Sequence, residues 1–300
     1  MITNPARIPH HWPNRDFSES IQIGNLHWHY QISRHQNSLA PSILLIHGTG
    51  SSAHSWNLIF NQLRESYTVV APDLPGHGFT QGATKDQLHI DQIALELKKL
   101  LEALKLWIPD TVVGHSAGAN CALTLATLGE EQPKALIGLN PSYVSPPAAY
   151  NYFLGPLINP IATSSILANF LSQTLGLTRM VDKLLDSTNS ILQENQRVHY
   201  RYLFAQPSHI HGSMNFMAAS DIPALLRKST TITSDITNLL TEDDPWIPQS
   251  SLQPVLTEYF PRAELIIKKG GHLFHEIFPA EVVRLIEQAT DVKKNQNETK

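Results

Sequence analysis

The chain has 300 residues, of which 42% are hydrophobic and 16% are charged, and its net charge is −4. A globular chain of this length buries a sizeable core and needs no disulfide or bound metal to stabilise it. Its single cysteine, Cys121, excludes an intrachain disulfide. No Lys/Arg cluster with interleaved aromatic residues occurs, so the composition gives no reason to expect a nucleic-acid partner.

Residues 1–20 are rich in Pro, Asn and His and predict an extended lead-in. They contain neither the basic and apolar regions of a secretory signal nor an Arg- and Ser-rich transit segment. We therefore expect a cytoplasmic protein, and peripheral attachment to a membrane stays an open alternative. Fifteen histidines occur, but pairs such as His27/His29 and His209/His211 lack the further ligands of a closed metal site, so we expect no metal.

The strand and helix patterns alternate along the first half of the chain. Residues 21–32 alternate apolar and polar side chains around Gly24-Asn25, which predicts a β-hairpin with one buried face. Four short apolar runs follow, as expected for parallel strands covered on both faces: 42–47, 67–71, 111–114 and 135–139. Helical spacing over 91–104 and 117–128 separates these runs. The pattern predicts an α/β class with a doubly wound, mostly parallel sheet.

The alternation stops after residue 140 and resumes with strand patterns at 236–240 and 264–268 and a closing helix at 280–289. The region between shows helical patterns and no strand pattern. We therefore predict a helical cap inserted into the sheet domain. The predicted parts are a lead-in (1–20), a core (21–140 and 226–292), a cap (141–225) and a polar tail (293–300).

The sequence Gly114-His115-Ser116-Ala117-Gly118 lies between an apolar strand and a helix. A serine hydroxyl is a poor nucleophile until a base takes its proton. The strand–turn–helix context resembles the nucleophile turn of the α/β-hydrolase fold, in which flanking glycines let a strained turn expose the serine. This resemblance implies that Ser116 is the nucleophile. It also implies an oxyanion hole from the Ala117 N–H and the Thr49 N–H, with Gly50 close to it.

In that fold an acid and then a histidine follow the serine. Leu240-Thr-Glu-Asp-Asp-Pro-Trp-Ile-Pro248 offers three acids, and Glu242 lies nearest the strand end. The string Asp-Pro-Trp-Ile-Pro resembles the acid loop of the family and favours Asp244, with Asp243 as the alternative. His272 directly follows a glycine turn, as in the family pattern, and is preferred to His275 as general base.

Further strings resemble the magnesium-chelatase accessory hydrolases of chlorophyll and bacteriochlorophyll biosynthesis. They are Trp12-Pro-Asn-Arg15, Leu26-His-Trp-His29, His47-Gly-Thr-Gly-Ser-Ser-Ala-His-Ser-Trp56, Asp73-Leu-Pro-Gly-His-Gly-Phe-Thr80, Gly114-His-Ser-Ala-Gly-Ala119, Gly138-Leu-Asn-Pro141 and Gly271-His-Leu-Phe-His-Glu276. The resemblance implies a cofactor-independent hydrolase acting on an ester of a hydrophobic substrate, such as a tetrapyrrole, with transient contact to magnesium chelatase. A non-catalytic porphyrin-binding or chelatase-assisting factor is the alternative. Dehalogenase and epoxide-hydrolase chemistry is disfavoured because those relatives place Asp where this chain has Ser116.

Residues 135–178 contain no Asp, Glu, Lys or Arg. Prolines and scattered polar residues interrupt this run, which argues against a transmembrane segment. Aromatic residues there suit either packed cap helices or a large apolar pocket. The predicted substrate-binding residues are Gly50, His115, Tyr152, Phe153, Phe216 and Met217.

Overall fold

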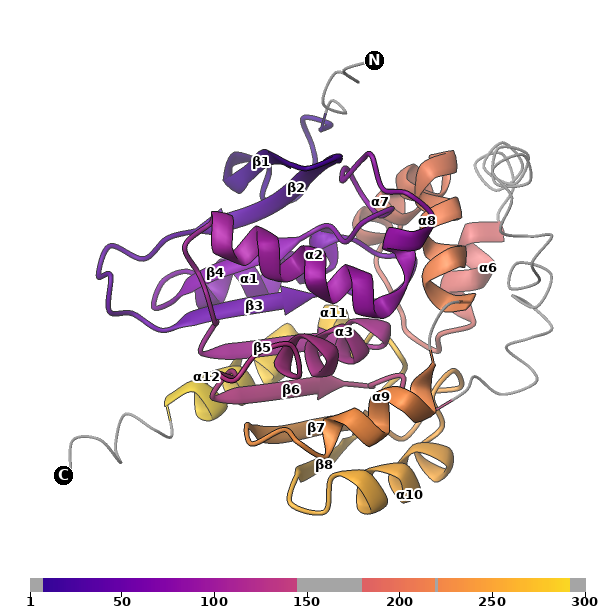
Figure 1. Cartoon of the computed structure of the whole chain (residues 1–300). Coiled ribbons are helices and arrows are strands. Elements are labelled where there is room, and N and C mark those ends of the chain that lie inside the picture. The colour runs from indigo at the N-terminus through magenta and orange to yellow at the C-terminus, as the bar shows by residue number, and fades with distance from the viewer. Residues whose placement is uncertain (1–7, 145–179, 219–220, 292–300) are drawn as a thin grey trace.

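The computed structural model describes residues 8–144, 180–218 and 221–291, and Figure 1 shows their arrangement. An eight-stranded sheet with the order β1-β2-β4-β3-β5-β6-β7-β8 forms its centre. The strands are β1 (Ser18–Ile23), β2 (Leu26–Ser33), β3 (Ser42–Ile46), β4 (Thr68–Pro72), β5 (Thr111–His115), β6 (Ala135–Leu139), β7 (Asp235–Thr241) and β8 (Glu264–Lys268). The pairs β3–β4, β3–β5, β5–β6, β6–β7 and β7–β8 are parallel, so the predicted doubly wound, mostly parallel sheet is confirmed.

Helices connect the strands on both faces of the sheet (Figure 1). The helices of the described residues are α1 (Asn57–Leu63), α2 (Ile90–Ala103), α3 (Ala117–Ala126), α6 (Met180–Asp186), α7 (Glu194–Phe204), α8 (Pro207–Ala218), α9 (Ile222–Ser229), α10 (Gln249–Tyr259), α11 (Phe274–Ile277) and α12 (Pro279–Asp291). Short 3-10 turns complete the set: η1 (Arg15–Phe17), η2 (Ala53–Trp56) and η3 (Asp86–Leu88).

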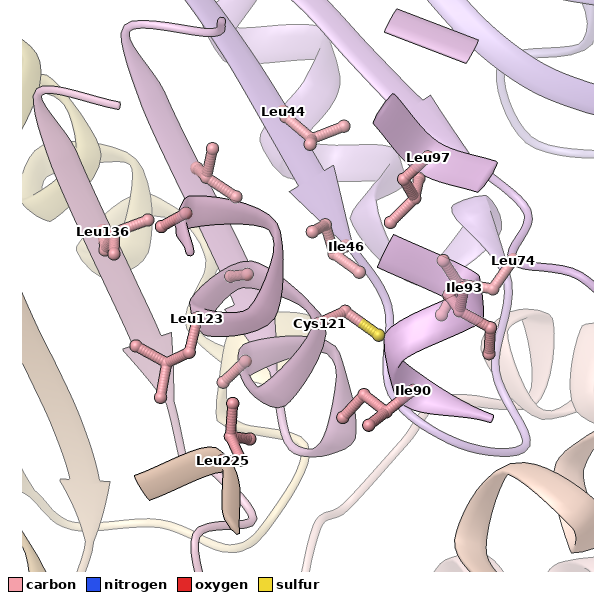
Figure 2. Packing of buried hydrophobic residues seen from close by; sticks show 14 of the residues in the cluster. Leu44, Ile46, Leu74, Ile90, Ile93, Leu97, Cys121, Leu123, Leu136 and Leu225 are labelled. Atoms are coloured by element: carbon pink, nitrogen blue, oxygen red, sulfur yellow. The ribbon is translucent and has the colours of Figure 1, made fainter. Parts of the chain in front are cut away.

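Two apolar layers explain why the strands are continuous apolar runs. Leu44 and Ile46 of β3 pack with residues of α2, α3, α9 and α10 on one face, as Figure 2 shows for part of this layer. Ile43 and Leu45 of the same strand pack with α1 and α12 on the other face. Successive side chains of a strand point to opposite faces, so a strand covered on both sides needs apolar residues at every position. Each fully buried Leu or Ile stabilises the fold by about 1.5–3 kcal/mol.

The N-terminal hairpin differs in one respect from the prediction. β1 and β2 pair antiparallel around Gly24, as expected. The expectation of a single buried face is wrong for β2, because His29 and Gln31 on its second face are also buried. The lead-in covers this face, where Gln31 Nε2 donates to Pro13 O at 2.7 Å, and His29 pairs with Asp73.

β6 and β7 are adjacent in the sheet although the predicted cap separates them in sequence. Within the described residues of this region, α6, α7 and α8 lie together beyond the carboxyl ends of the parallel strands (Figure 1). α9 crosses the predicted boundary at 225/226 and packs on α3, with Leu225 and Leu226 in the core. In the part of the chain that the structure describes, no helix is long and apolar enough to cross a membrane.

Candidate active site

Ser116 lies in the turn between β5 and α3. Its backbone has φ 52° and ψ −120°, a left-handed conformation that is strained for a residue with a side chain. The chain around it is too close-packed for side chains at the two glycines. A Cβ on Gly114 would lie 2.4 Å from the Ala119 backbone, and one on Gly118 would lie 2.3 Å from Ile46 O. These two approaches explain why the turn requires Gly-x-Ser-x-Gly.

Of the three neighbouring acids after β7, Asp244 is buried, whereas Glu242 and Asp243 are exposed. Its Oδ1 accepts hydrogen bonds from Trp246 N at 2.8 Å and Ile247 N at 3.0 Å. Its Oδ2 lies 2.7 Å from His272 Nδ1. Backbone donors therefore fix the carboxylate in one orientation, with its second oxygen directed at the imidazole.

His272 is buried on the loop after β8. Asn140 Nδ2 donates to its carbonyl at 3.0 Å, and the indole of Trp246 packs on its ring with centroids 5.2 Å apart. With Nδ1 directed at Asp244, the opposite ring nitrogen, Nε2, is the one left to exchange a proton with a hydroxyl.

Strands β3, β5, β7 and β8 run parallel, so the loops after them meet at one edge of the sheet. This topology brings Ser116, Asp244 and His272 to the same edge. The loop after β3 also lies against the serine, because a Cβ on Gly48 would lie 3.1 Å from Ser116 Cβ. The structure thus places Thr49 in the loop after β3 and Ala117 at the amino end of α3, directly after Ser116.

Ala117 is the first residue of α3, so no carbonyl within the helix can accept its backbone N–H. The amino end of a helix favours negative charge. Thr49 is half-buried, and its Oγ1 is buried without a hydrogen-bond partner among the described residues. The amino end of α3 can therefore present a backbone donor to a charged oxygen near Ser116, and the donor role of the Thr49 N–H stays a prediction.

The predicted substrate-binding residues lie in different surroundings. His115 is buried below the histidine loop, and its Nε2 donates to His272 O at 2.9 Å. Burial holds the pKa of His115 well below its usual range, so the ring stays neutral. Gly50, with φ 73°, faces the ring of Phe204. Phe216 is fully buried in the core, where its ring packs edge-on against His77.

Three other residues predicted to bind substrate are not placed by the structure. Tyr152 and Phe153 lie outside the described residues. Met217 belongs to α8, but its side chain is outside the described part.

A second buried charged centre lies behind the loop after β3 and was not predicted from the sequence. Asp73 accepts hydrogen bonds from Ala53 N, Phe79 N and His29 Nδ1 at 2.7–2.8 Å. Burial alone would raise the pKa of Asp73, but the His29 partner and the N–H donors lower it to about 2. The buried carboxylate joins the loops after β3 and β4. In the sequence, Asp73 and His29 stood out only as members of two of the strings that resemble the family.

Among the described residues, no group of three or more His, Cys, Asp or Glu side chains could hold a metal ion. His47 instead bridges two loops, since its Nε2 accepts from Leu74 N at 3.0 Å. Cys121 is buried, which raises the pKa of its thiol and disfavours the thiolate.

Comparison with known proteins agrees with this architecture. Residues 43–285 match the alpha/beta hydrolase family, and the chain belongs to that family. It is similar to the magnesium-chelatase 30 kDa subunit of Rhodobacter capsulatus, with 28% identity over 281 residues, 91% of this chain and 94% of that protein.

Two solved structures share the fold. A putative lipase from Acinetobacter baumannii AYE has a TM-score of 0.73 at 21% identity, covering 89% of this chain and 88% of the lipase chain. The epoxide hydrolase CorEH has a TM-score of 0.74 at 19% identity, covering 90% and 97%. The predicted α/β-hydrolase fold and the resemblance to the chelatase-associated relative are both confirmed.

Proposed function

We propose that the chain is a serine hydrolase that cleaves an ester of a hydrophobic substrate, with Ser116 as nucleophile, His272 as base and Asp244 as its orienting acid. The observation that carries this proposal is the buried 2.7 Å pair of Asp244 Oδ2 and His272 Nδ1 at the sheet edge where Ser116 stands in its strained turn. Three unrelated loops converge there, and packing of a core does not require a polar pair at that place.

In the proposed reaction, Ser116 Oγ attacks the ester carbonyl carbon while His272 Nε2 takes the hydroxyl proton. The carbonyl electrons move to the oxygen, which the Ala117 and Thr49 N–H groups stabilise. Collapse of this intermediate expels the alkoxide, which takes the proton from His272 and leaves as the alcohol. Water, deprotonated by His272, then releases the acid and restores Ser116. Asp244 holds the imidazole tautomer and stabilises its positive charge.

A tetrapyrrole ester is the proposed substrate class. The uncharged run 135–178 suits a large apolar ligand, and the similar Rhodobacter protein is named as a magnesium-chelatase subunit. Tetrapyrrole intermediates carry propionate, methyl-ester and isoprenoid-ester groups. We also propose that the protein contacts magnesium chelatase transiently and that it uses no cofactor.

A fluorophosphonate probe tests the nucleophile, because it reacts only with an activated serine. Wild type should be labelled, and Ser116→Ala should abolish labelling and turnover of a panel of pigment and p-nitrophenyl esters. The matched control is Ser142→Ala, a serine at the same sheet edge whose backbone N–H donates to Ser116 O. Intact labelling of Ser116→Ala would remove Ser116 from its proposed role.

The name of the chelatase relative also favours a second candidate, a porphyrin-binding or chelatase-assisting factor that does not use the triad. In that case, Ser116→Ala would still restore chlorophyll-precursor flux in a strain lacking the protein, and the purified protein would quench the fluorescence of added porphyrin. Failure of the variant to restore flux would favour the hydrolase.

A further inference from the structure

A short segment between α6 and α7, residues Ser187 to Ser190, reaches from the predicted cap region to the loops that carry Asp244 and His272. We call it the 187–190 segment. Thr188 and Ser190 are buried although the segment has no regular secondary structure. Asn189 has φ 52°, a left-handed conformation that turns the chain sharply. Loops are normally exposed, so a buried and sharply turned loop indicates specific contacts.

The segment holds the histidine loop at the backbone. His272 N donates to Thr188 O at 2.9 Å, and Leu273 N donates to Ser190 Oγ at 2.9 Å. The approach leaves no room for a side chain on Gly271, where a Cβ would lie 2.1 Å from Asn189 O. The glycine before the proposed base is therefore required by contact with this segment.

The same segment also holds the acid loop. Asn189 Nδ2 donates to Asp243 O at 3.1 Å, and Trp246 Nε1 donates to Ser187 Oγ at 3.2 Å. Trp246 in turn donates its backbone N–H to Asp244 Oδ1 and packs its indole on the ring of His272. Four hydrogen bonds thus connect one segment to both loops of the Asp244–His272 pair.

The sheet alone does not fix these loops. Ladder pairing of β7 with β8 ends at Thr241 and Lys268, and the last backbone bond between the two loops is from Asp243 N to Gly270 O. Beyond that bond, the backbone N–H of His272 is satisfied by the 187–190 segment. An error of about 1 Å in the position of a catalytic group can cost about 100-fold in rate, so whatever holds this N–H matters for catalysis.

We infer that the 187–190 segment is a positioning element that aligns Asp244 with His272, so that the inserted helices help to set the turnover rate as well as to bind substrate. The inference rests on the proposed hydrolase function. Ser187, Thr188, Asn189 and Ser190 touch no reacting atom in this scheme and act through the two loops.

The test is a kinetic double-mutant cycle on a small p-nitrophenyl ester. Ser190→Ala removes the acceptor of Leu273 N, and we expect kcat to fall about tenfold with KM within about twofold. In an Asp244→Asn background the same change should have no further effect, because residues that act as one unit are not additive. The matched control is Ser229→Ala, a buried serine whose hydroxyl donates to Leu226 O within its own helix, α9, and to neither loop. It should lower the melting temperature without changing kcat.

Asn189→Gly is a second probe that keeps the left-handed backbone and removes only the bond to Asp243 O, and we expect kcat to fall about threefold. If Ser190→Ala does not fold, Asn189→Gly alone tests the positioning role of the 187–190 segment. Wild-type kcat in the folded variants, or full additivity with Asp244→Asn, would overturn the positioning role. Failure of the proposed function is a separate result, because wild type would then show no ester turnover, or Ser116→Ala would keep it.

Discussion

If the proposed mechanism holds, replacing Asp244 by Asn inactivates the enzyme by fixing the wrong tautomer of His272. Asp244 Oδ1 accepts from two backbone N–H groups, at Trp246 and Ile247, and only an oxygen can do so. The asparagine must therefore point its oxygen at the backbone and its NH2 group at His272 Nδ1. That nitrogen then becomes an acceptor, the ring proton moves to Nε2, and Nε2 can no longer take the proton of Ser116.

The expected loss is large because the packing leaves the amide no second orientation. A flipped amide would set its NH2 group against the N–H groups of Trp246 and Ile247, an unpaired buried contact that costs about 1–3 kcal/mol for each donor. A triad with the wrong tautomer loses about 10⁴-fold in kcat, which corresponds to about 5.4 kcal/mol of transition-state stabilisation. The assay is steady-state hydrolysis of a p-nitrophenyl ester from pH 6 to 9, with the melting temperature measured alongside.

Asp243→Asn is the matched control, because this neighbouring acid is exposed and its side chain does not orient the imidazole. We expect its kcat to stay within about threefold of wild type, as for other surface changes. A kcat for Asp244→Asn within tenfold of wild type would refute the tautomer argument. A larger loss of kcat in Asp243→Asn than in Asp244→Asn would show that Asp243, and not Asp244, is the acid.

Two further predictions concern the stability of the fold around the candidate site. Gly118→Ala would place a Cβ 2.3 Å from Ile46 O and should lower the free energy of unfolding by about 1–3 kcal/mol. Gly129→Ala is the control, because its Cβ would have no neighbour closer than 3.6 Å and should not lower stability. Thermal melting of the two variants measures the difference. Burial raises the pKa of Glu276 from 4.5 to about 8, so folding favours its protonated form and stability falls as pH rises between these values. The slope from one such group is at most about 1.4 kcal/mol of unfolding free energy per pH unit. Glu276→Gln stays neutral and should flatten it. An unchanged slope would contradict the raised pKa of Glu276 as its cause.

Much of the fold could be predicted because its signals are local. The apolar runs of β3, β5 and β6 predict strands that are covered on both faces, and the two glycines predict the serine turn. Helix α10 escaped prediction because Pro254 lies inside it. The second buried face of β2 escaped because the lead-in that covers it has no regular pattern.

The acid and the 187–190 segment were harder to predict than the serine turn, for a physical reason. Glu242, Asp243 and Asp244 are chemically alike and adjacent, and only the two backbone donors at Trp246 and Ile247 distinguish the last of them. The sequence Ser187-Thr-Asn-Ser190 has the composition of any polar turn. Its partners lie 54 to 84 residues away in the chain, so no local pattern could indicate them.

The position of β8 in the sheet has a consequence for how activity fails on heating. β8 is the last strand in the sheet order, pairs only with β7 in the described sheet, and leads directly to the loop of His272. Edge elements with few buried contacts open locally at a lower free energy than the whole domain, and three of the five residues of β8 are exposed. Thermal inactivation should therefore precede global melting, and amide hydrogen exchange in β8 should report the fraction of molecules whose proposed base has left its place.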